Sequence, residues 1–293
     1  MRGIFSYFRK LPRDKALKRG ELIGKFLWAI HYRRKVVYQN LDFAFPDKPF
    51  SWKKDIAKKS IIHIGRIIAE FPKLQDYVKN DQMKDIFVIT KGKKLVEKYK
   101  DDGIVMITAH LGNWEMFGAG LSYTFKSFKD VYALAYRQEN EAVNKLIYQL
   151  RTGYGIHIIH HNDPLKNFLN ALNKKSIVIF LADQNTIRTR GVFVDFFGIK
   201  AITVTFPAKL SIRYKKPILF GYCHFNYEDK KYYCEIEEIE YEEGSNRDET
   251  VYNLTEAYTK KIENAVKKHP DQYLWVHKRW RTRPEGEPSL YND

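Results

Sequence analysis

The sequence is poor in cysteine and has no low-complexity stretch. Its two cysteines, Cys223 and Cys234, lack the paired spacing of a zinc site or a redox motif, so we interpret them as reduced thiols in a protein that faces the cytosol. Disulfides are not needed for stability, because 44% of the residues are hydrophobic and 19 Phe and 20 Tyr supply core material. The 293 residues therefore predict a globular chain rather than a disordered or disulfide-stabilised one.

Long apolar runs are also missing. A helix that spans a bilayer needs about 20 consecutive apolar residues, and the nearest candidate, 103–125, contains His110, Asn113 and Glu115. We interpret this stretch as buried core. The N-terminus lacks the form of a cleaved signal peptide, because cations directly follow the short apolar stretch 3–8.

Positive charge, in contrast, is abundant. There are 51 Lys and Arg residues against 35 Asp and Glu, which gives a formal net charge of +16. Such a charge attracts anionic surfaces and speeds association with acidic partners. Nucleic acid, anionic lipid and an acidic carrier protein all satisfy it, so charge alone does not choose among them.

Part of this charge lies in an amphipathic N-terminal segment. Between residues 15 and 45, apolar positions such as Leu22, Phe26 and Ile30 recur at helical spacing among Lys and Arg. One interpretation is a helix that lies on a membrane with its cations at anionic headgroups. The other is a helix packed on the protein with a solvated basic face. We divide the chain into a membrane-associating segment, 1–45, and a main domain, 46–293.

After a helix that begins at Ser51 and ends before Pro72, short β-rich runs alternate with helical ones. The predicted strands are 86–89, 104–108, 131–136, 156–159, 177–181, 218–224 and 232–239, of which the last is expected to be antiparallel. The predicted helices are 91–99, 114–122, 139–151, 164–173, 203–213 and 248–268. This alternation predicts an α/β fold with a mixed, largely parallel sheet flanked by helices.

The strand predicted at 104–108 delivers His110 to its carboxyl end, where the functional groups of such sheets collect. Glu115 follows in the first turn of the next helix, where a carboxylate can hydrogen-bond one imidazole nitrogen and leave the other to accept a proton. Because no Gly-x-Ser-x-Gly motif supplies a nucleophile, His110 would activate a hydroxyl of the substrate itself. Spacing alone, however, favours a structural histidine.

Four segments of the chain resemble the late acyltransferases of lipid A biosynthesis, a family related to the bacterial phosphatidylinositol mannoside acyltransferases. In chain order they are Tyr38–Pro46, the His-x4-Glu segment Ala109–Glu115, Asp183-Gln with Gly191–Gly198, and Gln272–Trp280 with Arg283-Pro284. They occur in the family's order and span nearly the whole chain. The sequence is therefore identified as a member of this family.

The resemblance implies acyl transfer without a covalent enzyme intermediate. His110 takes the proton of an acceptor hydroxyl, which attacks the thioester of an acyl carrier protein, while Glu115 holds the imidazole. Arg137 is implied to stabilise the oxyanion or to bind an acceptor phosphate, with a solvated strand-end arginine as the alternative. Asp183 either supports His110, binds the acceptor or caps a turn. Asn113 is a further candidate for binding substrate or the oxyanion.

Three cations near the C-terminus, Lys278, Arg279 and Arg281, suit the phosphates of a glycolipid, the acidic carrier protein or the membrane surface. The alternative is a solvated basic tail. We expect no cofactor and no metal, because the histidines within 157–161 lack a complete set of ligands at metal-binding spacing.

The expected partners are an acyl carrier protein as donor, a lipid A precursor as acceptor and the anionic inner membrane of a bacterium, at its cytoplasmic face. Longer members of the family begin with a transmembrane helix, whereas the short apolar start of this chain predicts monotopic or peripheral attachment.

Two alternatives remain. One is acylation of a glycerophospholipid or another glycolipid, although the chain has no Phe-Pro-Glu-Gly-Thr-like box. The other is a basic peripheral protein that binds membrane or RNA without catalysis. The second leaves His110 and Glu115 unexplained, and we therefore expect no nucleic acid partner.

Overall fold

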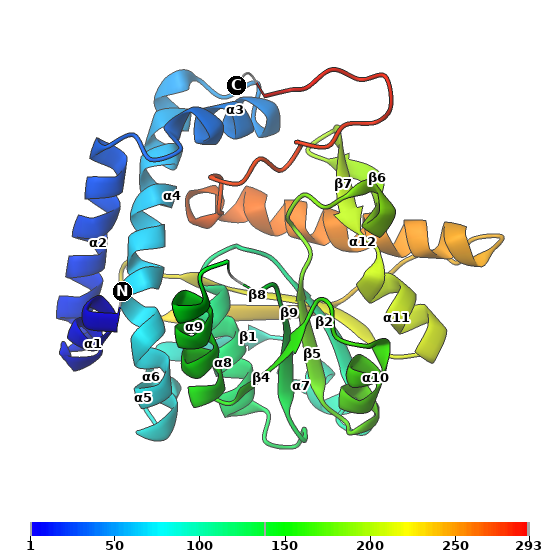
Figure 1. The fold of residues 1–293 in the computed structure, drawn as a ribbon, viewed down its shortest axis with the longest axis horizontal. Helices are drawn as coiled ribbons and strands as arrows, with labels where there is room; N and C mark the ends of the chain where they lie inside the picture. Colours follow the sequence, from blue (N-terminus) through cyan, green and yellow to red (C-terminus); the bar gives the residue numbers. More distant parts are fainter. Residues whose placement is uncertain (1, 138, 292–293) are drawn as a thin grey trace.

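Seven strands form the central sheet of the computed structural model, which describes residues 2–137 and 139–291 (Figure 1). Their order across the sheet is β1-β9-β8-β2-β5-β3-β4. The strands are β1 (Phe87–Lys91), β2 (Ile104–Thr108), β3 (Val131–Ala135), β4 (Ile156–His160), β5 (Ile177–Leu181), β8 (Ile218–Phe225) and β9 (Tyr232–Glu238).

Most of the sheet is parallel, as expected. Strand β2 lies at its centre and runs parallel to both neighbours, β5 and β8, and β3 runs parallel to β4 and β5. Strand β9 is antiparallel to β8, which confirms the expectation for this segment, and β1 follows the direction of β9. The carboxyl ends of β2, β5, β3 and β4 therefore meet along one edge of the sheet.

Helices cover both faces of the sheet. Alternation along β2 sends Val105 and Ile107 into one core and Ile104 and Met106 into the other. Helices α10, α11 and α12 pack on the first face and α8 on the second. The helices of the main domain are α4 (Phe50–Glu70), α5 (Leu74–Lys79), α6 (Met83–Ile86), α7 (Lys93–Lys98), α8 (Trp114–Thr124), α9 (Glu141–Gly153), α10 (Leu165–Asn173), α11 (Phe206–Tyr214) and α12 (Arg247–Lys268).

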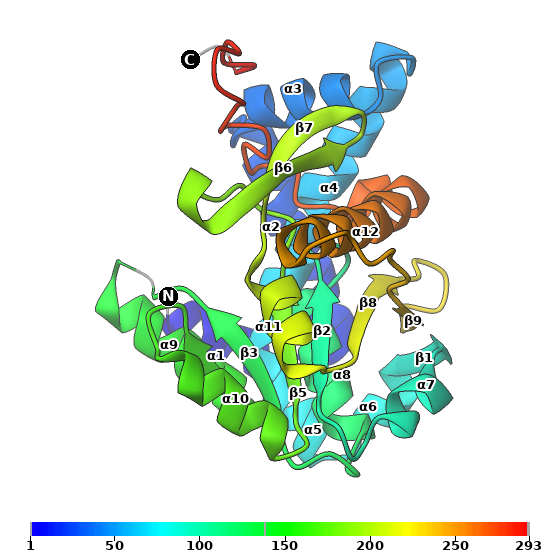
Figure 2. The same cartoon turned by 90° about the vertical axis from the view of Figure 1, so that its right-hand side faces the viewer.

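A two-stranded hairpin, β6 (Gly191–Phe196) and β7 (Ile199–Val204), stands apart from the main sheet. It packs on α12, which lies between the hairpin and the sheet (Figures 1 and 2). The sequence analysis did not predict this hairpin, and its predicted helix at 203–213 was wrong at the start, because 203 and 204 belong to β7. Residues Phe197 and Gly198 form the turn with φ of 56° and 74°.

Three helices precede the main domain: α1 (Arg2–Lys10), α2 (Arg13–Ala29) and α3 (Arg34–Ala44). The segment predicted as one helical pattern is thus two helices with a turn at 30–33. Helix α2 packs closely on α4, because a Cβ at Gly65 would lie 2.1 Å from the carbonyl oxygen of Gly20. None of the helices in the described part of the chain combines the length and the apolar composition that a membrane span requires.

Candidate active site

The register of the sheet brings the ends of β2 and β5 together. Thr108 pairs with Leu181 as the last residues of these parallel strands, so His110 and Asp183, each two positions further on, leave the sheet side by side. Nδ1 of His110 lies 2.9 Å from Oδ1 of Asp183. In this arrangement a carboxylate fixes both the orientation and the tautomer of an imidazole.

The charge of Asp183 determines which nitrogen carries the proton. Asp183 is only 2% exposed, and burial alone would raise the pKa of its carboxyl. The charge and hydrogen bonds of His110 outweigh burial, so the pKa of Asp183 is lowered from its usual value. An ionised carboxylate only accepts hydrogen bonds, so Nδ1 of His110 is the donor. Nε2 is then the nitrogen with a free lone pair.

The loop after β2 is held from three sides. Gly112 has a φ of 59°, and a Cβ there would lie 1.8 Å from a carbonyl oxygen of β8, so only glycine fits. The backbone N–H of Gly112 donates to the carbonyl of Gln272, and that of Leu274 donates to the carbonyl of His110, both at 3.0 Å. Nε2 of the buried His63 lies 3.0 Å from the Gly112 carbonyl oxygen and donates to it.

Glu115 is held by a different set of partners from the one expected. Nη2 of Arg151 lies 2.5 Å from Oε1 of Glu115, and the Tyr154 hydroxyl lies 2.6 Å from Oε2. Burial would raise the pKa of Glu115, but the Arg151 charge and these hydrogen bonds lower it overall. The expected hydrogen bond between Glu115 and the imidazole is not formed, because Asp183 takes Nδ1 of His110. The ion pair with Glu115 instead fixes the position of the Arg151 guanidinium.

His110 opens onto a cavity of about 1110 Å³. One wall is apolar and is formed by β3, β5, β7 and α11 through Leu134, Phe180, Leu181, Val204, Phe206 and Pro207. The other lining residues include five cations and several neutral polar side chains, and the described lining residues include no Asp or Glu. The lining cations are Arg33, Arg151, Arg190, Lys278 and Arg281. The cavity thus offers an apolar surface and a strongly anion-attracting one beside the imidazole of His110.

His277 also lines the cavity, and the sequence analysis did not single it out as a site residue. Its Nε2 accepts a hydrogen bond of 3.0 Å from the backbone N–H of Asn185. Burial lowers the pKa of His277 to about 4, so the ring is neutral near pH 7. The ring lies on the C-terminal segment 270–291, where its relation to His110 is set by long-range packing. The resemblance of the segment Gln272–Trp280 to the family was the available signal, but it does not give the position of His277 relative to His110.

Known proteins are similar to this sequence over nearly its full length. A sequence model of the bacterial lipid A biosynthesis acyltransferases matches residues 2–282. The chain belongs to this family. A lipid A biosynthesis acyltransferase of Haemophilus influenzae is 24% identical over 280 residues, which cover 94% of this chain and 85% of the relative. A lipid A biosynthesis lauroyltransferase of Escherichia coli is 24% identical over 306 residues, covering 99% and 92%.

A more distant likeness covers less of the chain. A phosphatidylinositol mannoside acyltransferase of Mycobacterium tuberculosis is 28% identical over 127 residues, which are 42% of this chain and 39% of that protein. Membership of the lipid A biosynthesis acyltransferase family makes the chain an acyltransferase, and it leaves the purely binding alternative without support.

In this acyltransferase, the predicted cations separate into two groups. Lys278 and Arg281 line the cavity, whereas Arg279 is 2% exposed and donates to the Ile202 carbonyl and to Thr203 Oγ1 at 2.6 and 2.5 Å. Arg279 therefore holds the hairpin strand β7, and it is not among the lining residues of the cavity. The expected role of Arg279 in binding phosphate or carrier does not fit this position.

Two other predicted residues also lie elsewhere. Arg137 is exposed at the end of β3 and is not among the lining residues of the cavity. Asn113 is fully buried, and its Oδ1 caps helix α8 by accepting from Met116 N–H at 3.0 Å. Its Nδ2 donates to the Tyr232 hydroxyl at 3.2 Å. Both ends of the Asn113 amide are therefore engaged, which leaves nothing for a substrate.

The cavity residues do not form a recognisable metal site. Within the described ranges, one group of three potential ligands comes within coordination range, and it comprises His224, Glu235 and His269, outside the lining of the cavity. The histidines of the segment 157–161 are not in this group.

Proposed function

We propose that this protein transfers a fatty acyl chain from an acyl carrier protein to a hydroxyl of a lipid A precursor, with His110 as the general base. One observation carries the proposal: the hydrogen bond of 2.9 Å between His110 and the buried, ionised Asp183, beside a cavity that is apolar on one wall and basic on another. The proposal places the reaction at Nε2 of His110.

The residues of the cavity support a route for the proton from the acceptor hydroxyl to the leaving thiolate. Nε2 of His110 takes the proton of the acceptor hydroxyl, whose oxygen attacks the thioester carbonyl carbon. The carbon–sulfur bond then breaks, and the imidazolium returns its proton to the leaving thiolate. Asp183 stabilises the imidazolium, and Arg151, which Glu115 fixes at the cavity wall, supplies positive charge for the developing oxyanion. Glu115 thereby acts through Arg151 rather than through the imidazole.

The apolar and the basic parts of the cavity match an acyl chain and anionic groups of the substrates, respectively. The apolar wall around Phe180 and Phe206 suits an acyl chain. The cations Arg33, Lys278 and Arg281 suit the phosphates of an acceptor glycolipid or the acidic surface of a carrier protein. The family assignment and the relatives' printed activities favour a lipid A type of acceptor.

Helix α2 supports membrane attachment through residues 1–45. The apolar residues of α2 divide into two faces: Leu17 packs in a core, whereas Leu22, Phe26 and, directly after the helix, Ile30 are 52, 61 and 54% exposed at a spacing of four. Among the described residues, seven of the twelve exposed large hydrophobic side chains lie in the first 50 positions. Because Arg33 lines the cavity three residues after Ile30, the exposed stripe would hold the cavity mouth at the membrane surface.

The catalytic proposal is tested with His110→Ala and purified substrates. We expect kcat to fall by roughly 10²- to 10⁴-fold, the usual contribution of a general base, with an unchanged unfolding temperature. Acyl carrier protein and coenzyme A thioesters are compared as donors. Lipid A precursor, lysophosphatidic acid and phosphatidylinositol mannoside are compared as acceptors. Full turnover by the folded variant would disprove the role of His110, and preference for another acceptor would disprove the substrate.

Attachment is tested by cosedimentation with anionic vesicles. The variant Phe26→Ser/Ile30→Ser should lose binding, because its apolar stripe is interrupted. Leu165→Ser is the matched control, since Leu165 is an exposed leucine of α10. Equal binding of both variants and the unmodified protein would reject the N-terminal attachment surface.

A further inference from the structure

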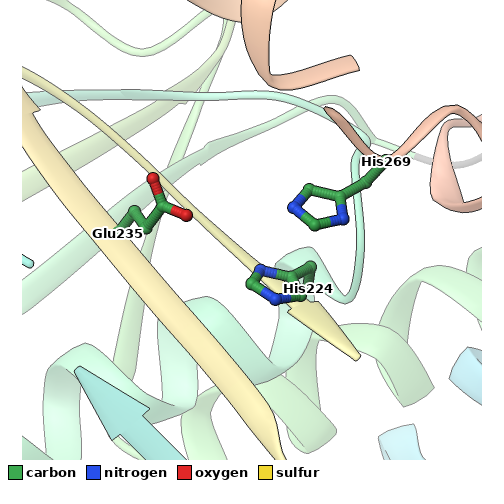
Figure 3. Close-up of side chains that lie close together, drawn as sticks. All are labelled: His224, Glu235 and His269. Carbon is green, nitrogen blue, oxygen red and sulfur yellow. The ribbon is translucent and has the colours of Figure 1, made fainter. Parts of the chain in front are cut away.

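A group of three side chains lies at β8, β9 and the end of α12, outside the catalytic cavity. His224 is in β8, Glu235 is in β9, and His269 follows the last residue of α12. We call these three residues the His-Glu-His cluster. One ligand atom from each lies within 4.8 Å of the others. Figure 3 shows the carboxylate and the edges of both rings facing one common space.

The fold accounts for this convergence. Strands β8 and β9 are antiparallel and pair Tyr222 with Glu235, so Glu235 and His224 lie diagonally across the same face of the sheet. Helix α12 packs on that face and ends beside it. The three residues come from positions far apart in the sequence, which is why ligand spacing along the chain does not reveal them.

Both histidines of the cluster are half-buried. The rings stack at a centroid distance of 3.9 Å. Nδ1 of His224 is buried and has no hydrogen-bond partner within the described part of the chain. A buried nitrogen without a partner carries an uncompensated desolvation cost.

We propose that the His-Glu-His cluster binds a divalent transition-metal ion, with Zn²⁺ as the best match. Two imidazoles and one carboxylate are a set of ligands that Zn²⁺ takes in proteins, with a fourth position left for water. The ion draws the three ligand atoms inward from their present separation and turns the stacked rings so that their lone pairs converge. It also displaces Lys268, whose Nζ now lies 3.3 Å from Glu235 and is mostly exposed.

The ion would act as a clip on the catalytic loop. His269 leads directly into the turn Pro270–Gln272. The side-chain amide of Gln272 bonds both backbone groups of Phe225 at 2.8 Å, and the backbone carbonyl of Gln272 accepts from Gly112 N–H. A bond from His269 through the metal to β8 and β9 therefore ties the turn that supports the loop after His110. The inference concerns stability and metal content, and does not depend on the acyl donor or acceptor.

The test is Zn²⁺ titration of the metal-stripped full chain, followed by calorimetry and thermal unfolding. We expect one equivalent to bind and to raise the unfolding temperature with increasing free Zn²⁺. Co²⁺ should give the visible absorption bands of a low-coordinate nitrogen and oxygen site, and the imidazole ¹⁵N resonances of two histidines should shift. His224→Gln, His269→Gln and Glu235→Gln should each weaken Zn²⁺ binding by about tenfold or more.

His157→Gln is the matched control. His157 Nε2 lies 3.2 Å from Asp130, and no third potential ligand joins this histidine–carboxylate pair among the described residues. This variant should bind one equivalent of Zn²⁺ like the unmodified chain. Absence of stoichiometric binding and of Co²⁺ bands in the unmodified protein would overturn the proposal. Equal binding by all three cluster variants, with circular dichroism showing that they fold, would also overturn it.

Discussion

Two histidine–carboxylate groups lie on neighbouring strands of this acyltransferase, and they differ in what satisfies their imidazole nitrogens. His110 donates to Asp183 at 2.9 Å and borders the cavity. His224 instead stacks on His269 and leaves a buried nitrogen without a partner within the described residues. Similar residue types thus stand in environments that favour different chemistry.

The difference shows that an imidazole is oriented as a base only where a carboxylate lies within hydrogen-bonding distance of one of its ring nitrogens. In the first group the parallel register of β2 and β5 delivers the two side chains side by side. In the second, antiparallel pairing places Glu235 opposite Tyr222 rather than opposite His224. The first group therefore supports our proposal of proton transfer at His110, and the second supports our proposal of a ligand that three separate side chains bind.

The largest effect is expected from Asp183→Asn, which removes the acceptor charge and keeps the shape. An asparagine does not stabilise the imidazolium and can favour the other tautomer, so kcat should fall by roughly 10²-fold or more while KM changes little. Steady-state kinetics with acyl carrier protein thioester checks this. Asp130→Asn removes the carboxylate beside the exposed His157 and should leave kcat unchanged. Equal losses in both variants would remove the distinction between the pairs.

The second prediction compares two arginines that follow β3. Arg151→Ala leaves Glu115 buried and without its ion pair, which should cost about 3–5 kcal/mol of unfolding free energy. Arg137→Ala alters an exposed side chain and should change stability by less than about 0.5 kcal/mol. Urea unfolding monitored by circular dichroism measures both. A loss for Arg151→Ala as small as that for Arg137→Ala would mean that the stability of buried Glu115 does not depend on Arg151.

Sequence reasoning predicted the sheet well because each central strand is a short β-rich run between helical patterns. It missed the β6–β7 hairpin, although the consecutive residues Phe197 and Gly198, both with positive φ, form a two-residue hairpin turn. A Gly after an aromatic between two apolar runs was the available signal. The prediction instead started a helix at residue 203, although residues 203 and 204 belong to β7 and the helix begins at Phe206.

The candidate site was predictable only as far as the strand ends. His110 and Asp183 follow apolar strands directly, and parallel neighbours bring such ends together. The pairing of Glu115 with Arg151 spans 36 residues and depends on how α9 packs beside α8. The spacing along the chain suggested that Glu115 hydrogen-bonds the imidazole of His110. In the structure, the Glu115 carboxylate, on the first turn of α8, faces Arg151 instead. Long-range packing of the C-terminal segment similarly places His277.

The smallest effect is expected from pH, through His63. Burial lowers the pKa of His63 to about 4 from 6.5, so protons favour the unfolded state, where the imidazole is accessible. This contribution to stability is complete above pH 6.5 and is lost as the pH falls to about 4. Asp183 and Glu115, whose pKa values are lowered, lose their contributions only at more acidic pH.

Unfolding free energies between pH 7 and 4 should therefore fall less steeply in His63→Gln, whose amide can still donate to Gly112. An unchanged slope would show that His63 is not the titrating group that holds the loop after His110.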